Sequence, residues 1–256
     1  MKKLLSLLAA ALFGLTTQVP AVCAPAAQPS AAARQASSAL KANQPDRAVS
    51  ILQKAALRGD ADAQYLLGML YKKSEALAPD INKAAAWLNR AAAQGQVQAT
   101  HLMGVLHTLG QGVSQDTGKA ADFFSRAANA GYAHSETALG LLYLHGDGVE
   151  KNEMAAAQWF QKAADHGDPQ AEYYLASLFK DGRGVAADPA KSLYWYEKSA
   201  ASGYAPAQTM LGVIYLLGRD NVRPDREKGI ALLRQAAAQG DQTAQTVLAG
   251  LPQGAQ

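Results

Sequence analysis

Six glycines recur at an almost constant interval, and this interval constrains the fold more than any other feature of the sequence. They are Gly59, Gly95, Gly131, Gly167, Gly203 and Gly240. Successive glycines are 36 residues apart, except that the last two are 37 apart. A period in this range with helical patterning inside it is typical of a helical solenoid, in which each unit packs on its neighbours. The 256 residues therefore need not divide into separate compact domains.

Each full unit is predicted to contain a helix A, a turn, a helix B and a second turn. Helix A carries a small residue at the same place in every unit: Gly68, Gly104, Gly140, Ala176 and Gly212. Glycine inside a helix costs about 1 kcal/mol relative to alanine. Its recurrence predicts that a neighbouring helix backbone passes too close for a Cβ atom.

Helix B is predicted to begin at a short polar side chain that accepts hydrogen bonds from the first turn. These residues are Asp80, Asp116, Asn152, Asp188 and Asp225. Farther along, a large residue precedes a small pair and is expected to interlock neighbouring helices. The large residues are Trp87, Phe123, Trp159, Trp195 and Leu232. The closing glycine is expected to end helix B in a left-handed conformation.

The predicted organisation follows from this period. Residues 1–26 form a signal peptide, residues 27–30 a short disordered lead-in, and residues 31–59 two N-terminal capping helices. The five full repeats are predicted at residues 60–95, 96–131, 132–167, 168–203 and 204–240. Residues 241–256 form a C-terminal capping helix and a tail.

The first residues have the pattern of a secretory signal. Lys2 and Lys3 precede an uncharged apolar run, residues 4–15, that is too short to span a bilayer. Ala24-Pro25-Ala26 supplies a small-x-small site, so cleavage is expected after Ala26. The alternative is a lipoprotein anchored through Cys23, although the preceding residues depart from the usual lipidation pattern. A periplasmic or secreted location is therefore expected, with membrane anchoring as the minor alternative.

Charge and cysteine content exclude several classes of function. There are 24 lysines and arginines against 21 aspartates and glutamates, so the chain is not expected to bind nucleic acid. Cys23 is the single cysteine, and cleavage after Ala26 removes it. The mature protein is then stabilised by packing without disulfides.

The repeated residues resemble a known family. The unit reads Ala-x-x-x-Leu-Gly-x-x-Tyr, Gly-x-Gly-Val, an Asp, Lys-Ala, an aromatic residue and Ala-Ala-x-x-Gly. This is similar to the Sel1-like repeats, relatives of the tetratricopeptide repeat, from about Ala48 to Ala249. The resemblance implies an all-α, right-handed α-solenoid of helix-turn-helix repeats with terminal capping helices. It also implies an adaptor or scaffold role; exported bacterial members are implicated in envelope assembly, polysaccharide export, motility and host interaction.

Two motifs that suggest chemistry are better explained otherwise. The Gly-x-Gly turns, such as Gly182-Arg183-Gly184, lie between helices, whereas a phosphate-binding loop follows a strand. Ser38-Ala39-Leu40-Lys41 matches the Ser-x-x-Lys of penicillin-recognising enzymes. The accompanying Ser-Asp-Asn and Lys-Thr-Gly elements are absent, so a hydrolase of that type is an unfavoured alternative.

No catalytic, cofactor-binding or metal site is predicted, and no cofactor is expected. His101 and His134 lie on neighbouring helices A and are expected to face one another, but no paired carboxylate or cysteine completes a ligand set. His107 occupies the ring position of helix A and is expected in the core. Glu172 and the other carboxylates are expected to be scattered over solvated helix faces.

The remaining candidate is a surface. In stacks of this type helix A lines the concave side, and residues three, four and three apart share one helix face. The candidate groove residues on that face are Tyr65, Met69, Lys72, His101, Val105, His134, Thr137, Leu141, Tyr173, Ser177, Lys180, Thr209 and Val213. The middle column, one residue per repeat, is Met69, Val105, Leu141, Ser177 and Val213. Its members could instead help neighbouring helices to pack.

The sequence thus predicts a non-enzymatic scaffold that binds a peptide or an amphipathic helix of another protein in a concave groove. Neither a nucleic acid nor a small-molecule substrate is expected, and no second apolar run could span a membrane. The alternative is a module that binds envelope glycan or peptidoglycan, with Tyr65 and Tyr173 as stacking platforms.

Overall fold

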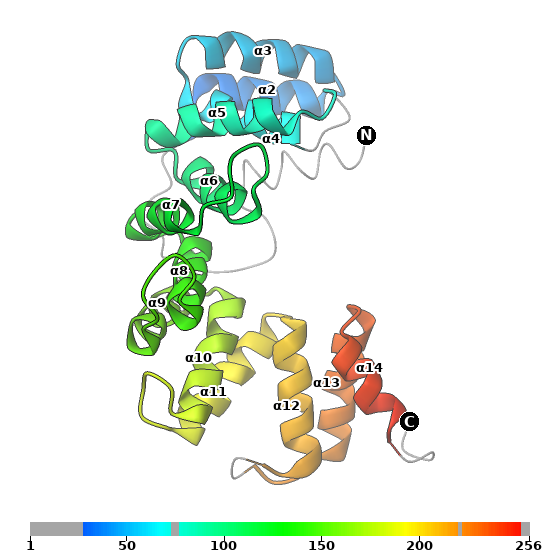
Figure 1. Cartoon of the computed structure of the whole chain (residues 1–256). Helices are drawn as coiled ribbons and strands as arrows, with labels where there is room; N and C mark the ends of the chain where they lie inside the picture. The colour runs from blue at the N-terminus through cyan, green and yellow to red at the C-terminus, as the bar shows by residue number, and fades with distance from the viewer. Residues whose placement is uncertain (1–27, 73–76, 220–221, 252–256) are drawn as a thin grey trace. The chain divides into compact units, whose positions relative to one another are not determined.

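The computed structural model describes residues 28–72, 77–219 and 222–251 (Figure 1). Every regular element within these ranges is an α-helix. The helices are α2 (Ala31–Lys41), α3 (Pro45–Leu57), α4 (Ala61–Lys72), α5 (Ile81–Ala93), α6 (Val97–Leu109), α7 (Thr117–Asn129), α8 (Ala133–His145), α9 (Glu153–Asp165), α10 (Pro169–Asp181), α11 (Pro189–Ala201), α12 (Ala205–Leu217), α13 (Arg226–Ala238) and α14 (Gln242–Ala249). The predicted signal peptide, with Cys23, lies outside the described residues.

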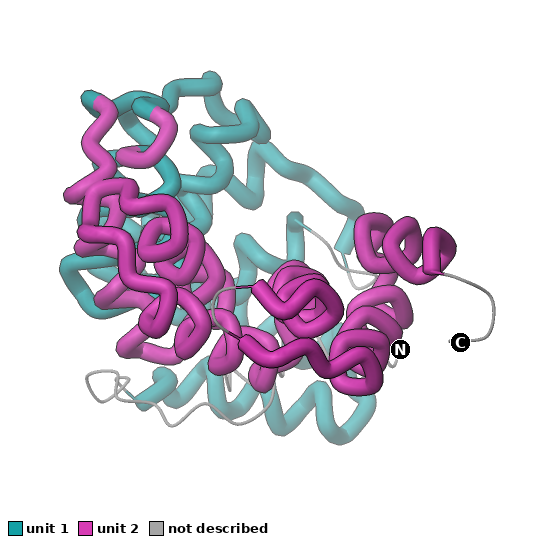
Figure 2. Tube along the Cα trace, turned by 90° about the horizontal axis from the view of Figure 1, so that it is seen from below, with its two compact units in different colours: residues 1–142, 146–150 teal, residues 143–145, 151–256 magenta. Residues whose placement is uncertain are grey.

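The chain divides into two compact units (Figure 2). Unit 1 comprises residues 1–142 and 146–150, and unit 2 comprises residues 143–145 and 151–256. In unit 1 each helix from α2 to α7 packs on the next, and in unit 2 the same holds from α9 to α14. Because packing follows the order of the chain, the protein is an α-solenoid of helix-turn-helix repeats. This confirms the predicted fold class.

The predicted starts of helix B are confirmed by their hydrogen bonds. In each case a side-chain oxygen accepts the N–H of the residue three positions on, at 2.9–3.0 Å; the caps are Asp80, Asp116, Asn152, Asp188 and Asp225. The backbone N–H of each cap also donates to the ring residue of helix A in its repeat; for Asp188 the acceptor is Phe179 O, at 2.9 Å. The bond from the amide of Lys191 is the main reason that the pKa of Asp188 is lowered. These local bonds determine where helix A stops and helix B begins.

The N-terminal helices begin slightly differently from the prediction. Ser30, assigned to the lead-in, caps α2, and its own N–H donates to Asp62 Oδ2 at 2.8 Å. Ser30 therefore belongs to the folded part of the chain. The second capping helix starts at Pro45.

The closing glycines have φ between +78° and +95°, which confirms the predicted left-handed helix ends. The Gly-x-Gly turns add a second role for glycine. Gly182 ends α10 with φ +66°, whereas Gly184 lies against the first turn of α9. A Cβ atom on Gly184 would be 2.1 Å from Glu153 O. The turn thus holds one repeat against helix B of the preceding repeat.

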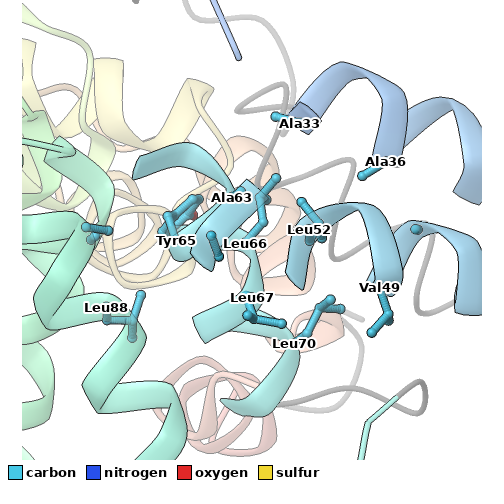
Figure 3. Packing of buried hydrophobic residues seen from close by; sticks show 14 of the residues in the cluster. Ala33, Ala36, Val49, Leu52, Ala63, Tyr65, Leu66, Leu67, Leu70 and Leu88 are labelled. Atoms are coloured by element: carbon cyan, nitrogen blue, oxygen red, sulfur yellow. The ribbon is translucent and has the colours of Figure 1, made fainter. Parts of the chain in front are cut away.

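The residue that interlocks the helices is one position later than predicted. The large side chains buried in the core are Leu88, Phe124, Phe160, Tyr196 and Leu233, each exposed by 4% or less. In the predicted column, Trp87, Phe123, Trp159 and Leu232 are only half-buried, although Trp195 is buried. The reason is helical periodicity: Ala84, Leu88 and Ala91 share the core face of α5, and Trp87 lies at its edge. Figure 3 shows part of this core in unit 1, where side chains of α2, α3, α4 and α5 meet.

The small residue of helix A faces the core side chain of helix B. A Cβ atom on Gly68 would lie 2.7 Å from Leu88 Cγ, and one on Gly104 would lie 2.7 Å from the Phe124 ring. The prediction of a close approach was right, but a side chain rather than a backbone makes the closest contact. At Gly212 the backbone is nearly as close, with Gly229 O at 3.0 Å.

Candidate functional site

The candidate groove residues occupy five helices. Tyr65, Met69 and Lys72 lie on α4; His101 and Val105 on α6; His134, Thr137 and Leu141 on α8; Tyr173, Ser177 and Lys180 on α10; and Thr209 and Val213 on α12. These helices belong to two units, so the residues are described below within each unit.

Three of the candidate groove residues are buried. Tyr65, Thr137 and Thr209 are exposed by 7%, 2% and 6%, so their side chains offer little surface to a partner. Tyr65 is part of the unit 1 core, and burial raises the pKa of its hydroxyl. The spacing within one helix does not reveal this burial.

The middle column is different, because all five of its side chains are half-buried. Met69, Val105 and Leu141 lie in unit 1, and Ser177 and Val213 lie in unit 2. Four of the five side chains are apolar. Half-burial means that each side chain is partly covered and still presents part of its surface.

In unit 1 the histidines of α6 and α8 face each other, as predicted. The ring centroids of His101 and His134 are 6.4 Å apart, and both rings lie next to Tyr132, at 5.1 and 5.6 Å. His101 Nδ1 is 2.8 Å from Ser135 Oγ. Across the described residues, no group of three or more histidine, cysteine, aspartate or glutamate side chains could hold a metal ion.

In unit 2 the corresponding face is lined by tyrosines. The ring centroid of Tyr173 lies 5.4 Å from that of Tyr174, 5.6 Å from that of Tyr196 and 5.6 Å from that of Tyr204. Tyr196 is buried, whereas Tyr173, Tyr174 and Tyr204 are half-buried. We call these last three residues the tyrosine cluster. Only Tyr173 among them was predicted, because Tyr204 precedes helix A and Tyr174 follows Tyr173 on another side of α10.

Helix A also carries a column of buried polar residues that the sequence analysis missed. The column is Gln64, Thr100, Glu136, Glu172 and Gln208, all exposed by 5% or less. A polar residue at the same place in every helix A was the available signal. The expectation that Glu172 lies on a solvated face is therefore wrong. Its side chain pairs instead with Lys198 on α11, the helix B of the same repeat.

Two members of this column, Gln64 and Gln208, connect consecutive repeats through a backbone carbonyl of the preceding helix B. Gln64 Nε2 donates to Ala56 O at 3.0 Å, and Gln208 Nε2 donates to Ala200 O at 3.3 Å. A carboxylate has no such donor, and where Glu172 stands the equivalent carbonyl, Ala164 O, accepts from Lys198 Nζ at 3.2 Å. The same polar contact between repeats is thus made by two different residue sets.

Glu172 is held as a buried ion pair. Its Oε1 is 3.0 Å from Lys198 Nζ, while its Oε2 is buried and has no hydrogen-bond partner among the described residues. Burial raises the pKa of Glu172, and the bond from Lys198 only partly offsets this. One pair on a packed helix surface does not form a catalytic arrangement.

Comparison with a family model decides the identity. Six consecutive segments match the Sel1 repeat: residues 37–60, 61–96, 97–132, 133–168, 169–204 and 205–241. The chain belongs to the Sel1 repeat family. The matched segments begin one residue after the predicted full repeats, and residues 37–60, assigned to the capping helices, are matched as a further repeat.

Solved structures of Sel1 repeat proteins have the same fold. A Sel1 repeat protein from Oxalobacter formigenes is 28% identical, with a TM-score of 0.80, and the match covers 86% of this chain and 88% of that one. The protective antigen c5321 of uropathogenic Escherichia coli is 32% identical, with a TM-score of 0.57. That match covers 80% of this chain, which spans about half of the antigen (51%). No curated protein sequence matched the chain.

A third solved structure shows the fold alone. The immunity protein Pa5087 from Pseudomonas aeruginosa is 22% identical, with a TM-score of 0.53, over 89% of this chain and 90% of that one. Sel1 repeat proteins generally serve as non-enzymatic scaffolds for protein–protein interactions.

Proposed function

We propose that this Sel1 repeat protein is an exported, non-enzymatic scaffold that binds a peptide or an amphipathic helix of a partner protein. Within each unit, the proposed binding face is the side of helices A that carries that unit's members of the middle column. One observation carries the proposal: the five side chains of this column, four of them apolar, all retain exposed surface. An apolar row with polar neighbours suits the apolar face of a partner helix or the alternate side chains of an extended peptide.

The burial of Tyr65 weighs against the glycan-binding alternative. Its ring is in the core of unit 1 and offers no face on which a sugar could stack. Ser38, the residue that suggested a penicillin-recognising enzyme, lies on α2, and its hydroxyl donates to Arg34 O, one helical turn earlier. A serine bonded within its own helix is not poised as a nucleophile.

The proposed export predicts a defined N-terminus. Expressed with its full sequence in a bacterium, the protein should be recovered beginning at Ala27, because Ala24 and Ala26 provide the small side chains of the cleavage site. Intact-mass analysis of the envelope and cytoplasmic fractions tests this. A species that begins at Cys23 and carries fatty acyl groups would contradict a free mature protein. No helix in the described ranges has the length and apolarity needed to cross a membrane.

Leu141→Asp tests the binding face. Leu141 lies on α8 in the middle column and is half-buried, so the substitution places a charge where an apolar partner side chain would be desolvated. Central interface residues commonly contribute about 2 kcal/mol, so capture of the partner should weaken about thirtyfold. Affinity capture from an envelope extract, followed by titration with the captured partner, measures the change.

The matched control is Gln158→Asp, which introduces the same charge at an exposed position of α9, a helix B. It should bind like the wild type. Circular dichroism comes first, because loss of helicity in Leu141→Asp would show that the residue serves packing. If Leu141→Asp folds and binds with wild-type affinity, the middle column is not the binding face.

A further inference from the structure

Tyr173, Tyr174 and Tyr204 are brought together from two neighbouring repeats of unit 2. Tyr173 and Tyr174 lie on α10, and Tyr204 is the cap residue of α12 (Figure 1). Tyr173 meets Tyr174 nearly edge-on at 72° and Tyr204 at 60°. Rings in this arrangement do not stack flat on each other, although Tyr174 stacks on the ring of Phe160, with centroids 5.3 Å apart.

The three hydroxyl groups of the cluster have no hydrogen-bond partner among the described residues, and none of them is fully buried. Tyr215 shows the contrast within the same unit, because its hydroxyl donates to Glu197 Oε1 at 2.9 Å. Tyrosines with a packed body and an accessible polar end are enriched in protein–protein interfaces. The cluster therefore has the properties of a contact surface.

The position of Tyr204 adds a second observation. Most helices A begin at a side chain that caps the first turn, as Asp168 does for α10 and Asp241 for α14. Tyr204 makes no such bond, so α12 lacks the cap hydrogen bond. A ring stands at a place where a short polar residue would better stabilise the helix.

Two carboxylates act on this cluster: Asp168 on Tyr204 and Asp241 on Tyr173. Burial raises the pKa of Tyr204 to about 12, and the neighbouring tyrosines and the carboxylate of Asp168 add to the effect. The pKa of Tyr173 is also raised, mainly by burial, then by Tyr174 and then by the carboxylate of Asp241. Aromatic faces in a negative field favour a cation.

We infer that the tyrosine cluster binds a cationic side chain, lysine or arginine, of the partner segment. The inference rests on the proposed function, because the partner supplies the cation. The guanidinium group suits the site best, since it is planar, weakly hydrated and able to stack on a ring while donating to hydroxyl oxygens. The cluster would then select partner segments with a basic residue beside their apolar side chains.

The test uses the whole chain and a defined probe, the acetylated and amidated tetra-arginine peptide, with tetraglutamate and tetra-asparagine as comparisons. Isothermal titration should detect binding of tetra-arginine only. The formal net charge of the full chain is +3, so general attraction between the molecules does not favour this result. Equal binding of the three peptides, or stronger binding of tetraglutamate, would overturn the inference.

Two substitutions locate the binding. Tyr204→Leu removes the ring but keeps an apolar side chain beside Ala200 and Ala207, and should weaken tetra-arginine binding at least about fivefold. Tyr204→Phe keeps the ring and should stay within about twofold of the wild type. A loss in Tyr204→Phe as large as in Tyr204→Leu would overturn the inference, because the hydroxyl and not the ring would then bind.

Tyr194→Leu is the matched control, since Tyr194 is a 56% exposed tyrosine of the same unit that belongs to α11. It should leave tetra-arginine binding unchanged, and an equal loss there would contradict the assignment to the cluster. Should Tyr204→Leu unfold, Tyr173→Leu provides the same test from α10. If Leu141→Asp lowers partner capture while tetra-arginine does not bind, this inference alone fails; if Leu141→Asp has no effect, the proposed function fails.

Discussion

Gly184→Ala should lower the free energy of unfolding by about 3 kcal/mol. Two effects combine at this residue. Its φ of +68° costs an L-amino acid about 1 kcal/mol or more. In addition, the new Cβ atom would lie 2.1 Å from Glu153 O and 2.7 Å from Met154 N, so the turn must move off α9. Such displacement in packed structure commonly costs about 1–3 kcal/mol.

The same movement would disturb a second contact. Arg183 lies in this turn and donates to Glu153 Oε1 from Nη2 at 2.7 Å and from Nε at 3.1 Å. This bond is the main reason that the pKa of Glu153 is lowered. The turn between α10 and α11 therefore touches the preceding repeat through its backbone and through one side chain.

Gly203→Ala is the matched control. Gly203 also has a positive φ, +84°, but a Cβ atom there would meet nothing within 4 Å. It should cost only the backbone strain, about 1 kcal/mol. Urea unfolding of both variants, followed by circular dichroism, measures the difference. Equal losses would show that the contact with α9 contributes nothing beyond backbone strain.

Lys198→Met should cost about 3 kcal/mol at neutral pH. It leaves the carboxylate of Glu172, which is 1% exposed, without its ion-pair partner, and breaking a buried pair from one side commonly costs about 3–5 kcal/mol. The lower end is expected because the side chain of Lys198 is 39% exposed. Ala164 O would lose a donor as well.

The double variant Glu172→Gln/Lys198→Gln should recover the stability that Lys198→Met loses. It copies the next repeat, where Gln208 donates to Ala200 O and Gln235 stands at the place of Lys198. A buried charge is thereby replaced by an amide that can donate to Ala164 O. The double variant should be at least as stable as the wild type at neutral pH. If it is less stable than Lys198→Met, the two residue sets are not equivalent.

The pH dependence gives a further check on Glu172. Because its pKa is higher in the folded state than in the unfolded state, ionisation destabilises the fold above the folded pKa. This cost is relieved as the pH falls through the folded pKa towards the ordinary pKa of a glutamate. The difference between Lys198→Met and the double variant should therefore shrink on acidification, and thermal melts at pH 7 and at about pH 5 measure it. A difference that grows at low pH would contradict a raised pKa.

The helix boundaries could be predicted because they depend on residues close together in the sequence. The cap residues of helix B accept amides three residues away, and the closing glycines adopt a conformation that other residues avoid. The free N–H and C=O groups at a helix end find their hydrogen-bond partners within a few residues along the chain. The same helix ends recur every 36 residues, and this recurrence made the fold class and the family predictable.

The core face of helix B needed the tertiary structure. The sequence placed a large residue in the right turn of the helix but selected Trp87 and its equivalents, whereas Leu88 and its equivalents fill the core. Adjacent large residues differ by about 100° around a helix. Which of the two is buried depends on the direction from which helix A approaches. Gly68 of helix A lies against Leu88, and this contact is seen only when the two helices are packed together.

The sequence by itself determined the repeat, its helix ends and the face that carries the candidate groove residues, since each rests on local spacing. Only the tertiary structure decided which members of that face are accessible. Tyr65 and Glu172 look like surface residues within their own helices, yet both are buried by side chains of other helices. The tyrosine cluster arises in the same way, because Tyr204 meets Tyr173 across a repeat boundary, 31 residues away. Burial and proximity are set by neighbours distant in the chain, and spacing within one helix does not encode them.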